Sequence, residues 1–185
     1  MQTAAVETGR APSLHNLIEN KLEFTQRKEA RIQKIKNQLE LQTLSLPQIY
    51  NINRSLYREY RKFQTDSALL YTLQNQKIAE NLQNADLLHE VEIQLANLYA
   101  MRGMYIEART ILDALQVAQL PKTLLPDYYE TCENFCSSYG QSTGEQKYYM
   151  QSEHYRDLLL SVLDTASFVY KIKCAAKNLY SYQPC

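Results

Sequence analysis

The hydrophobic positions between residues 95 and 121 recur at helical spacing on either side of one glycine. One apolar face precedes Gly103, and a second follows it at i, i+3, i+7 and i+10. These faces consist of Leu95, Ala96 and Tyr99 before the glycine, and of Tyr105, Ala108, Leu112 and Leu115 after it. Glycine adopts a positive φ at little cost, so Gly103 marks the end of the first helix. The pattern predicts two antiparallel helices joined by a tight turn.

This hairpin resembles a tetratricopeptide repeat (TPR). Such a repeat places a leucine and a small residue before Tyr, Gly, Tyr, Ala, two large apolar residues and a proline. Pro121 occupies the final position here. One helical hairpin cannot bury its own apolar face, so neighbouring hairpins are expected to stack on it. The resemblance implies an all-α fold of antiparallel helical hairpins stacked as a tetratricopeptide-like right-handed solenoid, with a long N-terminal helix.

The rest of the chain divides into further helices. The pattern predicts a long helix over 13–43, hairpins over about 47–82, 87–118 and 127–163, and a terminal helix over about 165–181. Residues 1–12 are polar without a period and are expected to form a disordered arm, which leaves 13–185 as a single helical-repeat domain. The first hairpin matches the repeat less well, because Thr72 and Asn75 stand at usually apolar positions. In the third hairpin, the polar segment 140–144 is expected to be a loop.

The composition agrees with an all-helical chain and argues against some classes of function. The chain has only four Gly and five Pro in 185 residues, mostly where helices are expected to end. Twenty basic and 20 acidic residues give a net charge of zero, which argues against direct nucleic-acid binding. The 15 Tyr suit packing between helices or a groove that faces a ligand. No apolar run reaches the roughly 18 to 20 residues of a membrane helix, and residues 1–12 lack a secretory signal pattern, so no membrane segment is expected.

Catalytic and metal-binding motifs are missing from the sequence. No stretch supplies a nucleophile with its base, a glycine-rich phosphate loop or a metalloprotease helix. Cys132 and Cys136 are spaced i, i+4, but a metal site would need two more ligands, and His15, His89 and His154 lie far from them in sequence. The cysteine pair is therefore expected to pack in the core. We expect a non-enzymatic protein with no cofactor and no metal.

Three motifs occur in an order that resembles one bacterial family. K-E-x-R-I lies at residues 28–32, F-x-x-D-S-A-L-x-Y at 63–71, and L-A-x-L-x-x-x-x-G-x-Y-x-E-A at 95–108. Over about residues 20–165 the chain resembles tetratricopeptide-like proteins described as uncharacterised or as transcriptional-regulator-like. The members resemble exported proteins whose helical repeats precede a membrane helix, a coiled coil and a cytoplasmic output region. The resemblance implies the sensory part of a membrane-anchored regulator, on its periplasmic side.

Stacked hairpins curve, so their first helices line a concave groove that can hold an extended peptide or a helix of another protein. The candidate groove residues are polar or aromatic positions off the packing stripe: Asn53, Tyr57, Tyr60, Asn97, Arg102, Tyr129 and Asn134. We expect a protein or peptide partner. A formed pocket would indicate a small-ligand sensor and an open groove a scaffold or adaptor, and the sequence leaves both open. The last helix has no partner after it, so a homodimer through that helix is a further possibility.

Overall fold

The computed structural model describes residues 14–41 and 43–180, which divide into two compact units between Leu44 and Ser45. The first unit contains α1 (Leu14–Lys36) and a 3₁₀ turn, Asn37–Glu40. The long helix expected over 13–43 therefore ends earlier, and Leu41 after the turn has an extended backbone. The expected arm over 1–12 lies outside the described residues, and the single domain expected over 13–185 stays a prediction.

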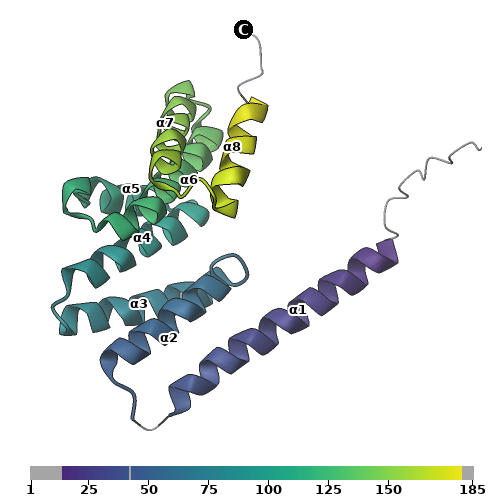
Figure 1. Ribbon diagram of the computed structural model, residues 1–185, viewed down its shortest axis with the longest axis vertical. Coiled ribbons are helices and arrows are strands. Elements are labelled where there is room, and N and C mark those ends of the chain that lie inside the picture. The colour runs from purple at the N-terminus through teal and green to yellow at the C-terminus, as the bar shows by residue number, and fades with distance from the viewer. Residues whose placement is uncertain (1–13, 42, 181–185) are drawn as a thin grey trace, which may run out of the picture. The chain divides into compact units, whose positions relative to one another are not determined.

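The second unit is a stack of helices. These are α2 (Leu46–Tyr60), α3 (Thr65–Asn81), α4 (Ala85–Met101), α5 (Tyr105–Ala114), α6 (Leu125–Thr143), α7 (Gln146–Val162) and α8 (Phe168–Tyr180). Three antiparallel hairpins, α2–α3, α4–α5 and α6–α7, follow one another, and α8 packs against α7 (Figure 1). Successive hairpins are joined by contacts of α4 with α3 and with α6. Within the described residues there is no β-strand, and the expected all-α solenoid is confirmed.

Local sequence signals mark several of the helix ends. A capping box formed by Ser45 and Gln48 starts α2. The Asn84 side chain accepts a hydrogen bond of 3.1 Å from the Leu87 N–H at the start of α4. Gly103 and Gly144, with φ of 76° and 72°, lie in the turns that close the second and third hairpins. The expected tight turn at Gly103 is therefore present.

Gly103→Ala is expected to lower the free energy of unfolding by about 1 kcal/mol, because an L side chain is strained at this positive φ. A Cβ atom there would have no heavy atom within 4 Å, so the cost is one of backbone conformation alone. Urea denaturation measures it. Gly103→Asn, which tolerates the left-handed region better, should lose less. Equal stability of the alanine variant and the parent would contradict the argument.

The third hairpin corrects one expectation. The segment 140–144 is not a loop, because α6 continues as a helix through Gly140 to Thr143 and only Gly144 and Glu145 separate it from α7. A Cβ at Gly140 would lie 3.3 Å from the Tyr148 Cβ, so this glycine lets the two helices approach closely. It is a packing residue rather than a loop residue.

The second hairpin is shorter than expected. Its second helix, α5, ends at Ala114, and two 3₁₀ turns, Val117–Gln119 and Lys122–Leu124, lead into α6. α6 begins at Leu125, with Pro126 in its first turn, where a missing N–H costs nothing. Pro126 thus belongs to the first turn of α6 and not to the connection before it.

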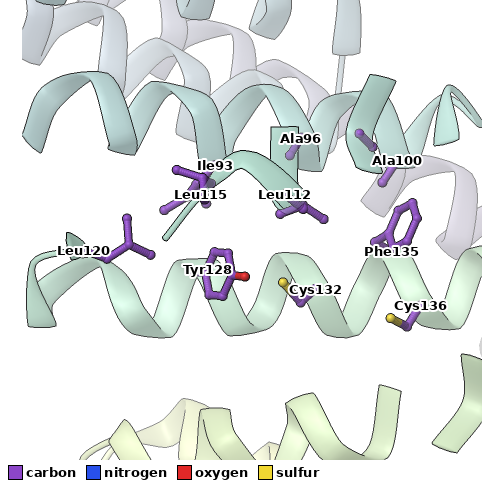
Figure 2. Close-up of a cluster of buried hydrophobic side chains, with 11 residues drawn as sticks. Ile93, Ala96, Ala100, Leu112, Leu115, Leu120, Tyr128, Cys132, Phe135 and Cys136 are labelled. Carbon is purple, nitrogen blue, oxygen red and sulfur yellow. The ribbon is translucent and has the colours of Figure 1, made fainter. Parts of the chain in front are cut away.

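The main hydrophobic core joins α4, α5 and α6. Its buried members are Ile93, Ala96, Ala100, Ala108, Leu112, Leu115, Leu120, Tyr128, Cys132, Phe135 and Cys136 (Figure 2). The small residues Ala96 and Ala108 are fully buried, as close helix packing requires. The spacing of small and large residues in the sequence therefore corresponds to the packing of this core.

The polar residues at apolar positions of α3 are buried and hydrogen-bonded. Thr72 Oγ1 donates to the Ala68 carbonyl at 2.8 Å, and Asn75 Nδ2 donates to the Tyr50 carbonyl of α2 at 3.0 Å. Buried polar groups are tolerated when they are paired in this way. Asn75 therefore joins the two helices of the first hairpin, whereas the Thr72 hydrogen bond lies within α3.

Ion pairs hold α8 against α6 and α7. The buried Glu133 carboxylate accepts from Arg156 Nε at 2.8 Å and from Lys173 Nζ at 2.6 Å. Lys173 also lies 3.7 Å from Glu130. Buried charges of opposite sign compensate one another's loss of hydration.

Across the described residues, no helix combines the length and the apolar character that a bilayer crossing requires.

Candidate functional site

The first helices of the three hairpins, α2, α4 and α6, line three adjoining cavities. One of about 300 Å³ lies toward the N-terminal ends of α4 and α6, one of about 220 Å³ lies next to it, and one of about 260 Å³ lies toward the C-terminal ends of α2 and α4. Neighbouring cavities share lining residues, Glu90 and Asp127 at the first junction and Asn97 and Glu130 at the second. The three cavities therefore adjoin one another along these helices, and we call them together the groove.

Amide and phenol groups form the base of the groove. Asn97 Nδ2 lies 3.4 Å from the Tyr57 hydroxyl, and both side chains are buried. Burial raises the pKa of Tyr57, so its hydroxyl keeps its proton. Among the described residues, Asn97 Oδ1 and Gln94 Oε1 are buried without a hydrogen-bond partner. A buried acceptor without a donor costs about 1–3 kcal/mol, so a ligand N–H would relieve this cost if the amide side chain turned its oxygen toward the groove.

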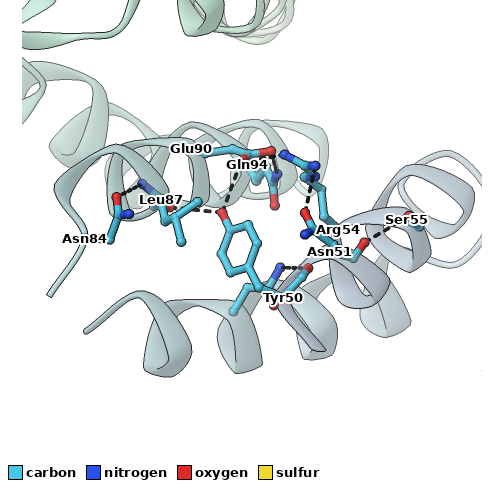
Figure 3. A network of polar contacts seen from close by, with 9 residues as sticks. Tyr50, Asn51, Arg54, Ser55, Asn84, Leu87, Glu90 and Gln94 are labelled. Atoms are coloured by element: carbon cyan, nitrogen blue, oxygen red, sulfur yellow. Dashed lines mark hydrogen bonds and ion pairs between the residues drawn. The ribbon is translucent and has the colours of Figure 1, made fainter. Parts of the chain in front are cut away.

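A polar network lies beside the first cavity of the groove, which Arg54, Leu87 and Glu90 line (Figure 3). The Tyr50 hydroxyl lies 3.1 Å from both the Leu87 carbonyl oxygen and Glu90 Oε2. Arg54 Nη1 reaches the same carboxylate oxygen at 3.4 Å, and Gln94 Nε2 donates to the other oxygen at 3.2 Å. Burial and the adjacent Glu90 raise the pKa of Tyr50. The network fixes α2 against α4 and sets the position of the Gln94 amide.

The two walls of the groove carry opposite charges. Arg58 and Arg61 extend from the end of α2, whereas Asp127 and Glu130 belong to α6. Within the described residues, neither arginine has a carboxylate within 4 Å. Loss of hydration in the wall and the nearby Glu130 raise the pKa of Asp127, while the two arginines lower it. The groove therefore presents a cationic wall opposite an anionic one.

Three of the sequence-predicted residues line the groove. Tyr57 and Asn97 meet at its base, and the exposed Asn134 lines its C-terminal end. Asn53 lies on the same helix as Tyr57, but it is only 1% exposed and does not line any of the three cavities. A binding role for these residues stays a prediction.

The other predicted residues lie elsewhere. The Tyr60 ring stacks on Tyr71 of α3 with centroids 5.9 Å apart. Arg102, at the end of α4, pairs with Asp66 at 2.6 Å. Tyr129 is half-buried and packs against the main core. These contacts are structural, and the groove does not bring these three side chains together with Tyr57 and Asn97.

Sequence reasoning missed the charged lining. Arg54, Arg58 and Arg61 follow one another at i, i+4 and i+7, which places them on one face of a helix, and this signal was readable. The opposing Asp127 and Glu130 lie more than 60 residues later in the chain, so only the stacking of the hairpins reveals that they face the arginines.

The cysteine pair lies in the core, as expected. Burial raises the pKa of the Cys132 thiol to about 12 and that of the Cys136 thiol to about 11. In the described part of the chain, no three His, Cys, Asp or Glu side chains are grouped so as to hold a metal ion.

Cys132 and Cys136 are expected to react with iodoacetamide at pH 8 about a hundredfold more slowly than the half-buried Cys174 of α8, because the thiolate is the reactive form. Mass spectrometry of peptides from the folded protein measures each rate. Addition of urea above the unfolding midpoint should equalise the rates. Equal rates in the folded protein would show that the thiols of α6 are neither buried nor held protonated.

Residues 18–184 match the family model described as the SusR N-terminal TPR domain. SusR is a sensor and regulator, so the match confirms the predicted resemblance to a TPR-like bacterial sensor region. A TPR-type domain is a non-catalytic repeat fold. No curated protein and no solved structure matches the chain at a significant level.

Proposed function

Because the chain belongs to the family of SusR N-terminal TPR domains, we propose that its groove binds an extended peptide segment of a partner protein. The domain would then be the non-enzymatic recognition part of a SusR-type regulator. The observation that carries this proposal is the row of three adjoining cavities along α2, α4 and α6, with unpaired amide oxygens at its base.

The length of the groove suits a short peptide. It extends along α4 from Asp86 to Met101. At about 1.5 Å of rise per helical residue, this distance is about 22 Å. An extended chain advances about 3.3 Å per residue, so six or seven residues fit.

The base of the groove suits a peptide backbone. The oxygens of Gln94 and Asn97 lack donors, and the N–H groups of an extended chain supply donors at regular intervals. Since a backbone carries one N–H for every residue, this recognition would be independent of the peptide sequence.

The walls of the groove select side chains. An acidic side chain would pair with Arg58 or Arg61, and a basic one with Asp127 or Glu130. The preferred peptide therefore carries acidic and basic residues on opposite sides. Charge complementarity of this kind contributes mainly to specificity and to the association rate.

An array of immobilised random nine-residue peptides tests the proposal. We expect a set of bound peptides that carry both charges, with Kd values below about 100 µM in solution. Fluorescence polarisation then compares variants. Arg58→Gln and Asn97→Ala should each weaken binding about tenfold. The first removes the charge that pairs with an acidic side chain of the peptide, and the second removes an acceptor for a peptide N–H.

Lys77→Gln is the matched control, because Lys77 is exposed on α3 and its substitution also removes one positive charge. It should leave the Kd unchanged. Failure of every peptide to bind, or equal binding by Arg58→Gln, would reject the groove as a peptide site. Circular dichroism of each variant verifies that the helices are intact.

Self-association is a second candidate function, favoured by α8. Phe168, Val169 and Ile172 form an apolar strip on this helix and are 76%, 48% and 51% exposed. A second copy of the chain could cover this strip. Light scattering should then give the mass of a dimer, and Phe168→Glu should give that of a monomer. A monomeric parent protein would exclude this function for α8.

A further inference from the structure

The helix that joins the first hairpin to the second buries few large apolar side chains. This helix is α3, which packs on α4. Its buried residues are Ala68, Thr72, Asn75, Ile78 and Ala79. Among them only Ile78 has a large apolar side chain, whereas α6 buries both Tyr128 and Phe135 in the main core. Since hydrophobic stabilisation grows with the apolar area buried, α3 gains less from its buried side chains than α6 does.

Buried polar atoms without a hydrogen bond lie around the same hairpin. Asn53 of α2 is 1% exposed, and neither atom of its amide has a partner within the described residues. Asn75 Oδ1 of α3 is unpaired as well, and so are the side-chain oxygens of Gln94 and Asn97 on α4. In the described residues of α5, α6 and α7, no side-chain N or O atom is buried without a partner. An unpaired buried polar atom destabilises the folded state, so this cost falls on the first hairpin and its contact with α4.

Opening of the first hairpin would dismantle the groove. α2 supplies the cationic wall, formed by Arg58 and Arg61, and Tyr57 at the base, whereas α4 and α6 supply the other lining residues. Asn97 Nδ2 of α4 lies 3.4 Å from the Tyr57 hydroxyl, and separation of the two helices would break this contact. The stability of a repeat stack is roughly a sum over its repeats and their interfaces, so a weakly held repeat can open while the others stay folded.

We propose that the first hairpin, α2–α3, opens as a unit while the second and third hairpins stay folded, and that a peptide in the groove holds it closed. The opening follows from the packing of α2 and α3 alone, whereas its coupling to a peptide rests on the proposed function. A ligand that binds only the closed state lowers the open population by the factor 1 + [L]/Kd. The cationic wall of the groove is therefore docked in part by the ligand itself.

Hydrogen exchange measured by mass spectrometry tests the opening in the full chain without any ligand. Relative to their intrinsic rates, the amides of α2 and α3 are expected to exchange at least about tenfold faster than those of α6 and α7. Because the two helices open together, their exchange should also accelerate with urea to the same degree. Equal protection of the first and third hairpins would overturn the proposal, and so would separate urea dependences for α2 and α3.

Asn53→Leu tests the part played by the unpaired amide. It replaces an unpaired polar group with an apolar one of similar size, so exchange in α2 and α3 should slow about tenfold. Asn51→Leu is the matched control, because Asn51 is exposed on the same helix and the substitution brings the same gain in helix propensity. It should slow exchange less than about threefold. Equal slowing by the two variants, or faster exchange in Asn53→Leu, would overturn the role of the amide.

The tightest peptide from the array tests the coupling. At about 100 times its Kd, it should slow exchange in α2 and α3 about a hundredfold. Unchanged exchange of these helices with the peptide bound would overturn the coupling. If no peptide of the array binds, the proposed function and the coupling are rejected together, whereas the opening is decided by the exchange of the free protein.

Discussion

Phe135→Ala is expected to lower the free energy of unfolding by about 3–5 kcal/mol, the range for removing a buried aromatic side chain. Phe135 is 6% exposed and stacks on Tyr139 with ring centroids 5.7 Å apart. It also meets Tyr105 of α5 edge-on at 6.1 Å. The substitution therefore removes a ring that packs between α5 and α6. Urea denaturation followed by circular dichroism measures the change.

Phe135→Leu is the matched control. It keeps most of the buried apolar volume and loses the ring contacts, so the expected cost is about 1–1.5 kcal/mol. A loss below about 1 kcal/mol for the alanine variant would mean that neighbouring side chains collapse into the space. In that case the aromatic cluster would not determine the stability of the second and third hairpins.

Glu133→Gln should destabilise the protein by about 3 kcal/mol, because two partly buried cations would lose their shared carboxylate. The Glu133 side chain is 8% exposed, and those of Arg156 and Lys173 are 17% and 19% exposed. Glutamine keeps the shape of the side chain, so packing is preserved while the charge is lost. Hydrogen exchange should also accelerate in α8, whose Lys173 is the ion-pair partner.

Glu130→Gln is the matched comparison, because Glu130 also lies near Lys173 but is less buried than Glu133. The Glu130 side chain is 33% exposed and lies 3.7 Å from Lys173, so the expected loss is below about 1 kcal/mol. Similar losses for the two variants would mean that burial of Glu133 adds nothing to its ion pairs. Unchanged exchange in α8 after Glu133→Gln would show that apolar contacts alone hold this helix.

Local signals were enough to predict the hairpins. The face periodicity and Gly103 give the second hairpin, because a positive φ and a 3.6-residue period depend only on neighbouring residues. Gly140 is a residue whose role local signals do not predict. In sequence it belongs to a polar, loop-like segment, but its position is set by contact with Tyr148 on the next helix. Close approach of two helices leaves no local signal.

The candidate site was predictable only in part. Tyr57 and Asn97 could be chosen because they lie on first helices away from the packing stripe, and both line the groove. Tyr60 met the same criterion but turns toward Tyr71 of its own hairpin. A difference of three positions along α2 rotates a side chain by about 60° relative to a full turn, which is enough to move it from one surface to the other. The packing of one helix against the next, rather than the residue type, decides which surface such a side chain faces.

Lys173 links α8 to a residue of α6 that lines the groove. Its ammonium group lies near both the buried Glu133 and Glu130, and Glu130 also lines the groove. A peptide cation that engaged Glu130 would compete with Lys173 and so weaken one of the contacts that hold α8. Thermodynamic linkage requires the reverse effect to be equal: release of α8 would favour the same cation by the same factor. Since this partly exposed pair, with 3.7 Å between its charged atoms, is expected to contribute at most about 1 kcal/mol, the coupling would be about fivefold or less. Occupancy of the groove would thus be transmitted to the C-terminal helix as a modest change in its docking equilibrium.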